Sequence, residues 1–109
     1  SDPMIAKAFA AMALRPGDDH SLLSLAHLAC LSRSAFAARF TDAIGKSPMQ
    51  VLRELRLRQA MFQLKASGLA VEHIARNAGY ASRSSFIKAF RRTYGIEPSK
   101  VRRSVAAEV

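Results

Sequence analysis

The sequence lacks the features of a secreted, membrane-spanning or low-complexity chain. Cys30 is its single cysteine, so no disulfide can form within it, and this fits a reducing compartment. No apolar run approaches the ~20 residues that a transmembrane helix needs, which predicts a soluble protein. Five glycines and four prolines are too few for a collagen-like chain. Because 50% of the 109 residues are hydrophobic, a packed core can form without disulfides.

The sequence also has few acidic residues. Seventeen Lys and Arg stand against eight Asp and Glu, which gives a net charge of +9. Residues 1–55 hold six basic and five acidic side chains, whereas residues 56–109 hold eleven basic and three acidic. The second half therefore carries most of the charge. This excess predicts a polyanionic partner, either nucleic acid or an anionic membrane surface.

The arrangements that catalysis or cofactor binding requires are missing as well. The three histidines have no metal-ligand spacing with one another or with Cys30. The serines near positions 32 and 82 have no paired histidine and acid, and there is no glycine-rich phosphate loop. We predict no enzymatic activity, no catalytic residue, no cofactor and no metal site.

What is present is a series of helix start and stop signals, with no sustained alternation of apolar and polar residues that would indicate strands. Asp2 before Pro3 is typical of an N-cap followed by a proline in the first turn. Ser21, Ser32 and Ser82 can cap further helices, and Gly45 and Gly95 can end two of them. The prediction is an all-α fold of about seven helices. Its parts are a first subdomain at about 3–46, a linker helix at about 48–67 and a second subdomain at about 69–107.

The chain contains an internal repeat. Residues 25–48 read LAHLACLSRSAFAARFTDAIGKSP, and residues 74–98 read IARNAGYASRSSFIKAFRRTYGIEP. Both copies place two phenylalanines four residues apart, and each continues to Gly-x-x-Pro. Two short helices joined by a tight turn and made twice predict two helix-turn-helix units. A linker helix of about eighteen residues, ~27 Å long, can hold two such units near the ~34 Å spacing of adjacent major grooves.

The second unit has a polar and basic face on its second helix. The apolar stripe Phe86, Phe90 and Tyr94 lies on one side at 100° per residue, as Phe36, Phe40 and Ile44 do in the first unit. The opposite side holds Ser84, Lys88, Arg91 and Arg92, with Arg83 in the first turn. A solvated face of a bundle would mix charge signs, but no acid occurs between Arg83 and Arg92. This pattern favours DNA contact.

The first unit carries less positive charge than the second, and its side chains are less able to contact base edges. Its groove-facing positions are Ser34, Ala37 and Ala38, which cannot form bidentate hydrogen bonds but can pack on thymine methyl groups. Asp42 on the same helix would repel phosphate. The side chains of Arg33 and Arg39 fit a phosphate contact or a solvated position equally well.

Two single residues have competing interpretations. Cys30 stands where the second unit has Gly79, at a turn position that often needs a left-handed backbone. We interpret it as a small buried residue in the turn rather than a redox sensor. Arg56 lies between Leu55 and Leu57 in the linker helix, and we interpret it as a structural, partly buried arginine rather than a phosphate ligand.

Taken together, these motifs resemble the AraC/XylS-type DNA-binding domain. The resemblance rests on A-x-x-A-C-L-S-R-S-A-F-x-x-x-F in the first unit and on Arg56-Leu57-x-x-Ala60-x-x-x-Leu64. It rests most on Ile74-Ala75, Ala78-Gly79-Tyr80, Ser84-x-Phe86, Phe90, Gly95-x-x-Pro98 and Arg102. It implies sequence-specific binding of double-stranded DNA by helices that begin near Ser32 and Ser82 in adjacent major grooves. RNA polymerase is a further partner that the resemblance makes possible.

The predicted DNA contacts follow from these faces. The predicted base readers are Arg83, Ser84, Ile87, Lys88, Ser34, Ala37 and Ala38, and the predicted phosphate contacts are Arg91, Arg92, Arg33 and Arg39. The alternative is a basic helical module that binds an anionic membrane surface or a protein partner. The stretch Asp2-Pro-Met-Ile-Ala-Lys-Ala-Phe resembles the junction to an upstream cupin-like domain. We therefore expect a monomeric DNA-binding part of a longer cytoplasmic, nucleoid-associated regulator whose missing upstream domain binds the effector.

Overall fold

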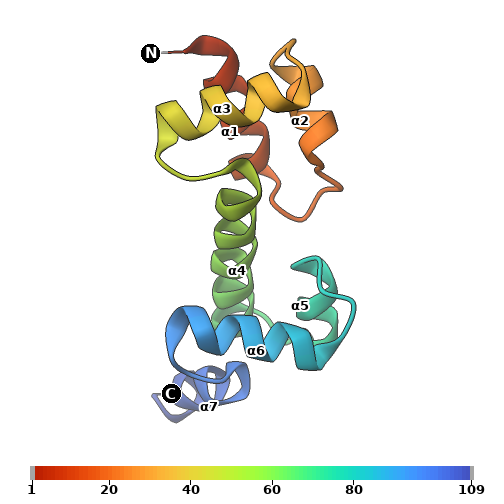
Figure 1. The fold of residues 1–109 in the computed structure, drawn as a ribbon. Helices are drawn as coiled ribbons and strands as arrows, with labels where there is room; N and C mark the ends of the chain where they lie inside the picture. The colour runs from red at the N-terminus through yellow and green to blue at the C-terminus, as the bar shows by residue number, and fades with distance from the viewer. Residues whose placement is uncertain (1, 109) are drawn as a thin grey trace. The chain divides into compact units, whose positions relative to one another are not determined.

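The computed structural model describes residues 2–108, which form seven α-helices and no strand (Figure 1). The all-α prediction is therefore confirmed. The helices are α1 (Pro3–Leu14), α2 (Leu22–Leu28), α3 (Arg33–Ile44), α4 (Pro48–Ala66), α5 (Val71–Asn77), α6 (Arg83–Tyr94) and α7 (Pro98–Ala107).

Helices α1, α2, α3 and α6 begin at the caps that the sequence predicts. The Asp2 carboxylate accepts hydrogen bonds from the first backbone N–H groups of α1, and Ser21 forms a capping box with Ser24. Ser32 and Ser82 cap α3 and α6 in the same way as each other, each through the N–H three residues ahead. Left-handed Gly45 and Gly95, with φ of 89° and 73°, end those two helices.

The chain divides into two compact units, and the division falls inside α4. The N-terminal unit extends to Leu55, and the C-terminal unit begins at Arg56. Helix α4 supplies Val51 and Leu52 to the core of the first and Leu57, Ala60 and Leu64 to the core of the second. The predicted linker helix is thus also part of both cores.

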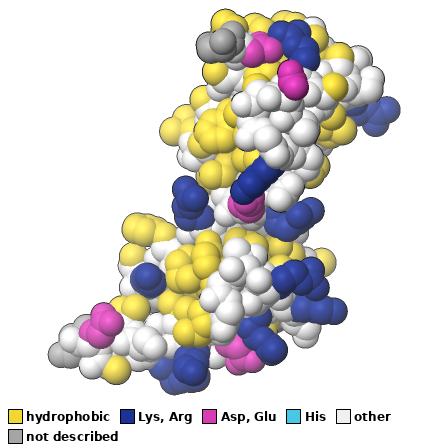
Figure 2. Space-filling model, turned by 60° about the vertical axis from the view of Figure 1, so that its left-hand side comes forward, with side chains coloured by type: hydrophobic (Ala, Val, Ile, Leu, Met, Phe, Trp, Pro, Cys, Tyr) yellow, Lys and Arg dark blue, Asp and Glu magenta, His cyan; other side chains and the backbone are white. Residues whose placement is uncertain are grey.

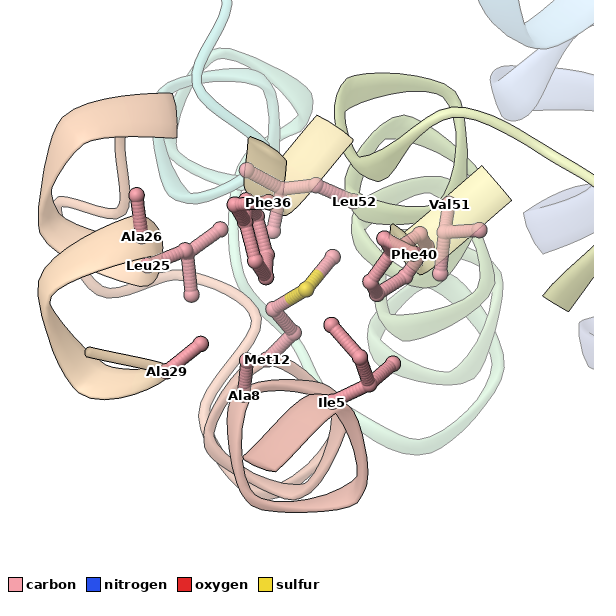
Figure 3. Close-up of a cluster of buried hydrophobic side chains, with 10 residues drawn as sticks. All are labelled: Ile5, Ala8, Met12, Leu25, Ala26, Ala29, Phe36, Phe40, Val51 and Leu52. Atoms are coloured by element: carbon pink, nitrogen blue, oxygen red, sulfur yellow. The ribbon is translucent and has the colours of Figure 1, made fainter. Parts of the chain in front are cut away.

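The N-terminal core gathers residues from α1, α2, α3 and the start of α4. Figure 3 shows the side chains of Met12, Leu25 and Phe36 pointing toward one another, with Phe40 and Ile5 beside them. The rings of Phe36 and Phe40 are 5.6 Å apart between centroids and tilted by 57°, a distance within the favourable range for aromatic pairs. The four-residue spacing of the phenylalanines thus places both rings in one core.

The C-terminal core repeats this arrangement with α5, α6 and α7 around the end of α4. Phe86 and Phe90 are fully buried, with ring centroids 5.7 Å apart. Ile74 of α5 and Val101 of α7 complete the contact with Leu64 of α4. The duplicated sequence therefore builds duplicated cores.

Three large apolar residues are not buried, and two of them, Ile44 and Tyr94, end the predicted apolar stripes. Phe62 is 68% exposed because it lies on the solvent side of α4, away from Leu57 and Leu64. Ile44 is 41% exposed in the last turn of α3. Tyr94 is 37% exposed, but its ring still packs on Phe90 at a centroid distance of 4.8 Å. The apolar stripes of α3 and α6 are therefore less buried at their last residue, where the helix extends beyond the core.

Arg102 of α7 fixes the C-terminal end of α4, a role that the sequence analysis did not assign. Its guanidinium donates to the carbonyl oxygens of Leu64 at 3.3 Å, Ser67 at 3.2 Å and Leu69 at 2.6 Å. The last carbonyls of a helix have no partner within it, and a charged donor with several N–H groups is well suited to satisfy them. Arg102 therefore ties α7 to the segment that joins α4 to α5.

The interpretation of Cys30 as a buried residue is wrong. Cys30 is exposed, and at φ 58° it is the non-glycine residue with a left-handed backbone within residues 2–108. The turn needs this conformation, as the equivalent Gly79 has a φ of 84°. Arg56 is half-buried, which agrees with its structural interpretation. Its guanidinium lies against the turn at Gly79, because a Cβ at position 79 would be 2.8 Å from Arg56 Nη1.

We predict that Cys30→Gly stabilises the N-terminal unit by about 0.5–1 kcal/mol, because glycine adopts the left-handed region without the steric cost that a Cβ brings. Gly79→Ala is the matched opposite, and it should destabilise the C-terminal unit by about 1–2 kcal/mol, since it adds backbone strain and displaces Arg56. Urea unfolding followed by circular dichroism measures both changes. An unchanged or lower midpoint for Cys30→Gly would contradict the first expectation.

Candidate nucleic-acid interface

The two helix-turn-helix units have the same turn. In the C-terminal unit Tyr80 N–H donates to the carbonyl of Ala75 at 3.0 Å. In the N-terminal unit Leu31 N–H donates to the carbonyl of Ala26, also at 3.0 Å. Each turn begins at a buried alanine and passes through one left-handed residue, after which a serine caps the next helix. The sequence repeat is therefore a repeat of backbone geometry, which directs α3 and α6 away from their preceding helices.

The predicted polar face of α6 forms an open, shallow depression on the C-terminal unit. It is lined by Ser84, Ile87, Lys88, Arg91 and Arg92. All but Ile87 are exposed, and Ile87 packs one side of its chain on the core around Phe86. Helical geometry explains the grouping, because residues three and four apart lie on one face. The structure thus brings together five of the predicted contact residues.

The arginines at both ends of α6 are paired with carboxylates from other elements. Arg83 Nη1 contacts Glu72 Oε1 of α5 at 2.5 Å, and Arg91 Nη1 contacts Glu97 Oε1 just before α7 at 3.4 Å. The hydrogen bond from its own backbone N–H, and then the one from Arg83, hold the pKa of Glu72 below its usual value. The stretch without acids in the sequence therefore has acids beside it in space.

Lys88 and Arg92 have no ion pair among the residues the structure describes. Both are exposed on the face of α6 that lines the depression. A lysine is a mobile point charge, whereas the planar guanidinium of arginine offers several donors in a fixed fork. These two side chains are thus the cations of this face that an incoming anion would meet without displacing a carboxylate.

The corresponding face of α3 in the N-terminal unit is smaller and less charged. Ser34 and Ala38 are exposed, and Ala37 is half-buried. Arg33 is exposed in the first turn. Arg39 is engaged elsewhere, because its Nε and Nη2 donate to Asp2 Oδ2 at 3.0 Å and 2.6 Å.

The pair between Arg39 and Asp2 joins α3 to the start of α1. Partial desolvation works against the charged form of Asp2, but the hydrogen bonds from Arg39 and from the backbone of α1 outweigh it, so the pKa of Asp2 lies below its usual value. Sequence reasoning left Arg39 open between a phosphate contact and a solvated side chain, and the structure gives it this intramolecular partner instead. The long sequence separation between positions 2 and 39 hid the contact.

Lysine and arginine side chains are distributed over the surface with few acidic side chains among them, as Figure 2 shows for one face. Within the described part of the chain no group of three or more His, Cys, Asp and Glu is placed to hold a metal ion. Nor is any helix there long and apolar enough to cross a membrane.

Comparison with known proteins agrees with this geometry. A family model described as a helix-turn-helix domain matches residues 25–104. The DNA-binding domain of AdpA, solved in complex with a target DNA, superposes with a TM-score of 0.87 at 30% identity, covering 99% of this chain and 96% of that one. The chain belongs to the AraC family of helix-turn-helix DNA-binding domains. The domains of this family are the DNA-binding domains of transcriptional regulators.

Curated relatives are transcriptional regulators of greater length. The RCS-specific HTH-type transcriptional activator RclR of Escherichia coli (strain K12) is 40% identical over 103 residues, which cover 94% of this chain and 36% of the relative. A putative AraC-like transcription regulator of Streptomyces lividans is 33% identical over 103 residues, covering 94% of this chain and 34% of the relative. The chain thus spans about a third of the length of these relatives. The alternative of a membrane-surface or protein-binding module is not favoured.

Sequence reasoning missed the acidic partners of this AraC-type domain. Asp2, Glu72 and Glu97 each hold an arginine that the sequence assigned to DNA. A signal existed for Glu97, which lies six residues after Arg91 at the end of the same helix. None existed for Glu72, because only the turn between α5 and α6 brings it to Arg83.

Proposed function

We propose that α6 enters a DNA major groove and reads base edges, with Arg83, Ser84, Ile87 and Lys88 as readers. The observation that carries this proposal is the single open face of α6, which gathers cationic, hydroxyl and apolar groups without an acidic lining residue. Arg83 and Lys88 would donate to guanine acceptors, and Ile87 would pack on a thymine methyl group. Ser84 can donate or accept.

Arg91 and Arg92 are proposed to contact the phosphates. They lie in the last turn of α6, three to nine residues after the proposed readers. Contacts of this kind fix the register of a reading helix but carry no sequence information. Arg91 would exchange its contact with Glu97, at 3.4 Å and largely exposed, for a phosphate.

For the N-terminal unit we propose a lesser contribution. Ser34, Ala37 and Ala38 of α3 would allow close approach to a second, adjacent major groove, and Arg33 would contact a phosphate. Arg39 would reach a phosphate only by leaving Asp2. The smaller charge and shorter side chains support the ranking in which the C-terminal unit supplies most affinity and specificity.

In the intact protein we propose that an additional upstream domain binds an effector and adds dimer avidity to this domain. The support is that the curated relatives are about three times as long as this chain. By itself the domain would be a monomer that binds DNA without a ligand, since two reading units lie in one chain. The regulator would act on the nucleoid in the cytoplasm, with RNA polymerase as a further partner.

Lys88→Ala should cost about 1–3 kcal/mol of binding free energy and relax the base preference at one position. Arg91→Ala should instead weaken all duplexes alike, because a phosphate contact does not depend on sequence. Selection of preferred duplexes from a random pool, repeated with each variant, measures both effects.

The control for these variants is Lys65→Ala, which removes a positive charge from an exposed position on α4, outside the α6 face. It should leave both affinity and preference close to those of the unchanged domain. If Arg33→Ala or Ala38→Glu weakened binding more than Lys88→Ala and Arg91→Ala, the ranking of the two units would be wrong.

A further inference from the structure

The first residue of α6 is held by a carboxylate from the preceding helix. Arg83 Nη1 donates to Glu72 Oε1 at 2.5 Å, and both side chains are 50% exposed. Glu72 lies in the first turn of α5, eleven residues before Arg83. The pair therefore crosses the helix-turn-helix unit and ends at the tip of the proposed reading helix.

The Glu72 carboxylate interacts with its own helix as well as with Arg83. Ala70, the N-cap of α5, makes no side-chain cap hydrogen bond, and the Glu72 carboxylate accepts from its own backbone N–H. The carboxylate thus has one anchor on its own helix and one on Arg83. The charge-assisted hydrogen bond to this carboxylate favours the Arg83 rotamers that keep the contact.

We propose that Glu72 is a positioning residue that determines the specificity of the C-terminal unit by orienting Arg83 and by opposing non-specific attraction to phosphates. This inference rests on the proposed function, in which Arg83 reads a base. Glu72 occupies Nη1 of Arg83 and leaves the edge formed by Nε and Nη2 open. Two parallel donors on that edge match the O6 and N7 acceptors of guanine.

The Glu72 carboxylate changes the affinity for the correct base relative to the affinity for an unrelated duplex. A free arginine tip can swing onto a neighbouring phosphate, and it loses rotamer freedom whenever it is immobilised. Arg83 held by Glu72 has already lost part of that freedom, and the negative charge beside it repels phosphate oxygens. Removing Glu72 should therefore strengthen binding to any duplex while weakening the preference for the correct base. A pair that served stability alone would leave the preference for the correct base unchanged when Glu72 is removed.

The test compares Glu72→Ala and Glu72→Gln with the matched control Glu97→Gln. Glu97 pairs with Arg91 and makes no side-chain cap hydrogen bond to α7, so its substitution removes one carboxylate from the same unit. Dissociation constants are measured at fixed salt for the selected duplex, for its three substitutions at the base pair sensitive to Arg83→Ala, and for a random duplex. Unfolding curves set a temperature at which every variant is folded.

For Glu72→Ala we expect random-duplex binding to tighten by about threefold, and discrimination at that base pair to fall by about threefold to tenfold. Glu72→Gln should tighten random binding similarly and lose less discrimination, because the amide oxygen still accepts from Arg83. Glu97→Gln should tighten binding to every duplex without a change in base preference. Adding Glu72→Ala to Arg83→Ala should cause no further loss of discrimination.

The outcomes separate the two proposals. If Arg83→Ala alters no base preference, Arg83 is not a reader and the proposed function of this residue fails. If Arg83→Ala removes a preference that both Glu72 variants retain in full, the role of Glu72 is overturned and that of Arg83 stands. An additional loss of discrimination in the double variant, beyond that of Arg83→Ala, would also overturn the positioning role.

Discussion

Raising the monovalent salt concentration from about 50 mM to about 200 mM is expected to weaken duplex binding by about a thousandfold. The reason is the eleven basic and three acidic residues from position 56 onward, together with the cationic face of α6. About six phosphate contacts give a slope of log K against log salt near −5, because each neutralised phosphate releases a condensed counterion. Fluorescence anisotropy with a labelled selected duplex measures this slope.

Two controls accompany the salt titration. The double variant Arg91→Ala and Arg92→Ala should make the slope shallower by about 2, since two phosphate contacts are removed. Anionic lipid vesicles measured in the same buffers should bind far more weakly than the duplex, because the apolar stripes are turned into the two cores. A slope near zero, or vesicle binding as strong as duplex binding, would contradict the proposed electrostatic contact with DNA.

Phe86→Ala is expected to destabilise the C-terminal unit by about 3–5 kcal/mol, because it leaves a cavity where a fully buried ring packed on two aromatic neighbours. This loss is comparable to the whole stability of a unit of this size. DNA binding should then disappear almost completely at 37 °C, a temperature chosen to be near the expected transition of the variant.

Phe36→Ala is the matched variant, since Phe36 is equally buried and packs on Phe40 with nearly the same ring distance. It should destabilise the N-terminal unit by a similar amount of about 3–5 kcal/mol. If the C-terminal unit dominates, this variant retains weaker but still base-selective binding. Heat capacity scans show which unit has unfolded, and anisotropy shows what remains. Complete loss of binding in Phe36→Ala with the C-terminal unit still folded would contradict the ranking.

The local structure of this AraC-type domain was readable from its sequence because the signals are local. Capping by Ser32 and Ser82 involves an N–H only three residues away, and the glycines at 45 and 95 end helices through their own backbone conformation. The repeat allowed each half to support the interpretation of the other. The cationic face of α6 followed from helical periodicity alone.

Errors arose where a residue's surroundings depend on distant segments. Phe62 is a large apolar side chain on α4, yet the core of the C-terminal unit takes Leu57, Ala60 and Leu64 from this helix and leaves Phe62 exposed. Cys30 was expected to be buried from the general behaviour of free cysteine, but it is exposed at a turn position with a left-handed backbone. Burial at such positions is set by which face the neighbouring helices cover.

The sequence by itself determined the helices, the two helix-turn-helix units, the family and the set of residues that face outward on α6. Only the tertiary structure decided which of the arginines are already engaged. Asp2 holds Arg39, Glu72 holds Arg83, and carbonyls in the last turn of α4 and in the segment after it hold Arg102. The physical reason is that a helix face depends on neighbours three and four residues away, whereas an ion pair depends on a distance in space, which chain folding sets across separations of 11 to 37 residues.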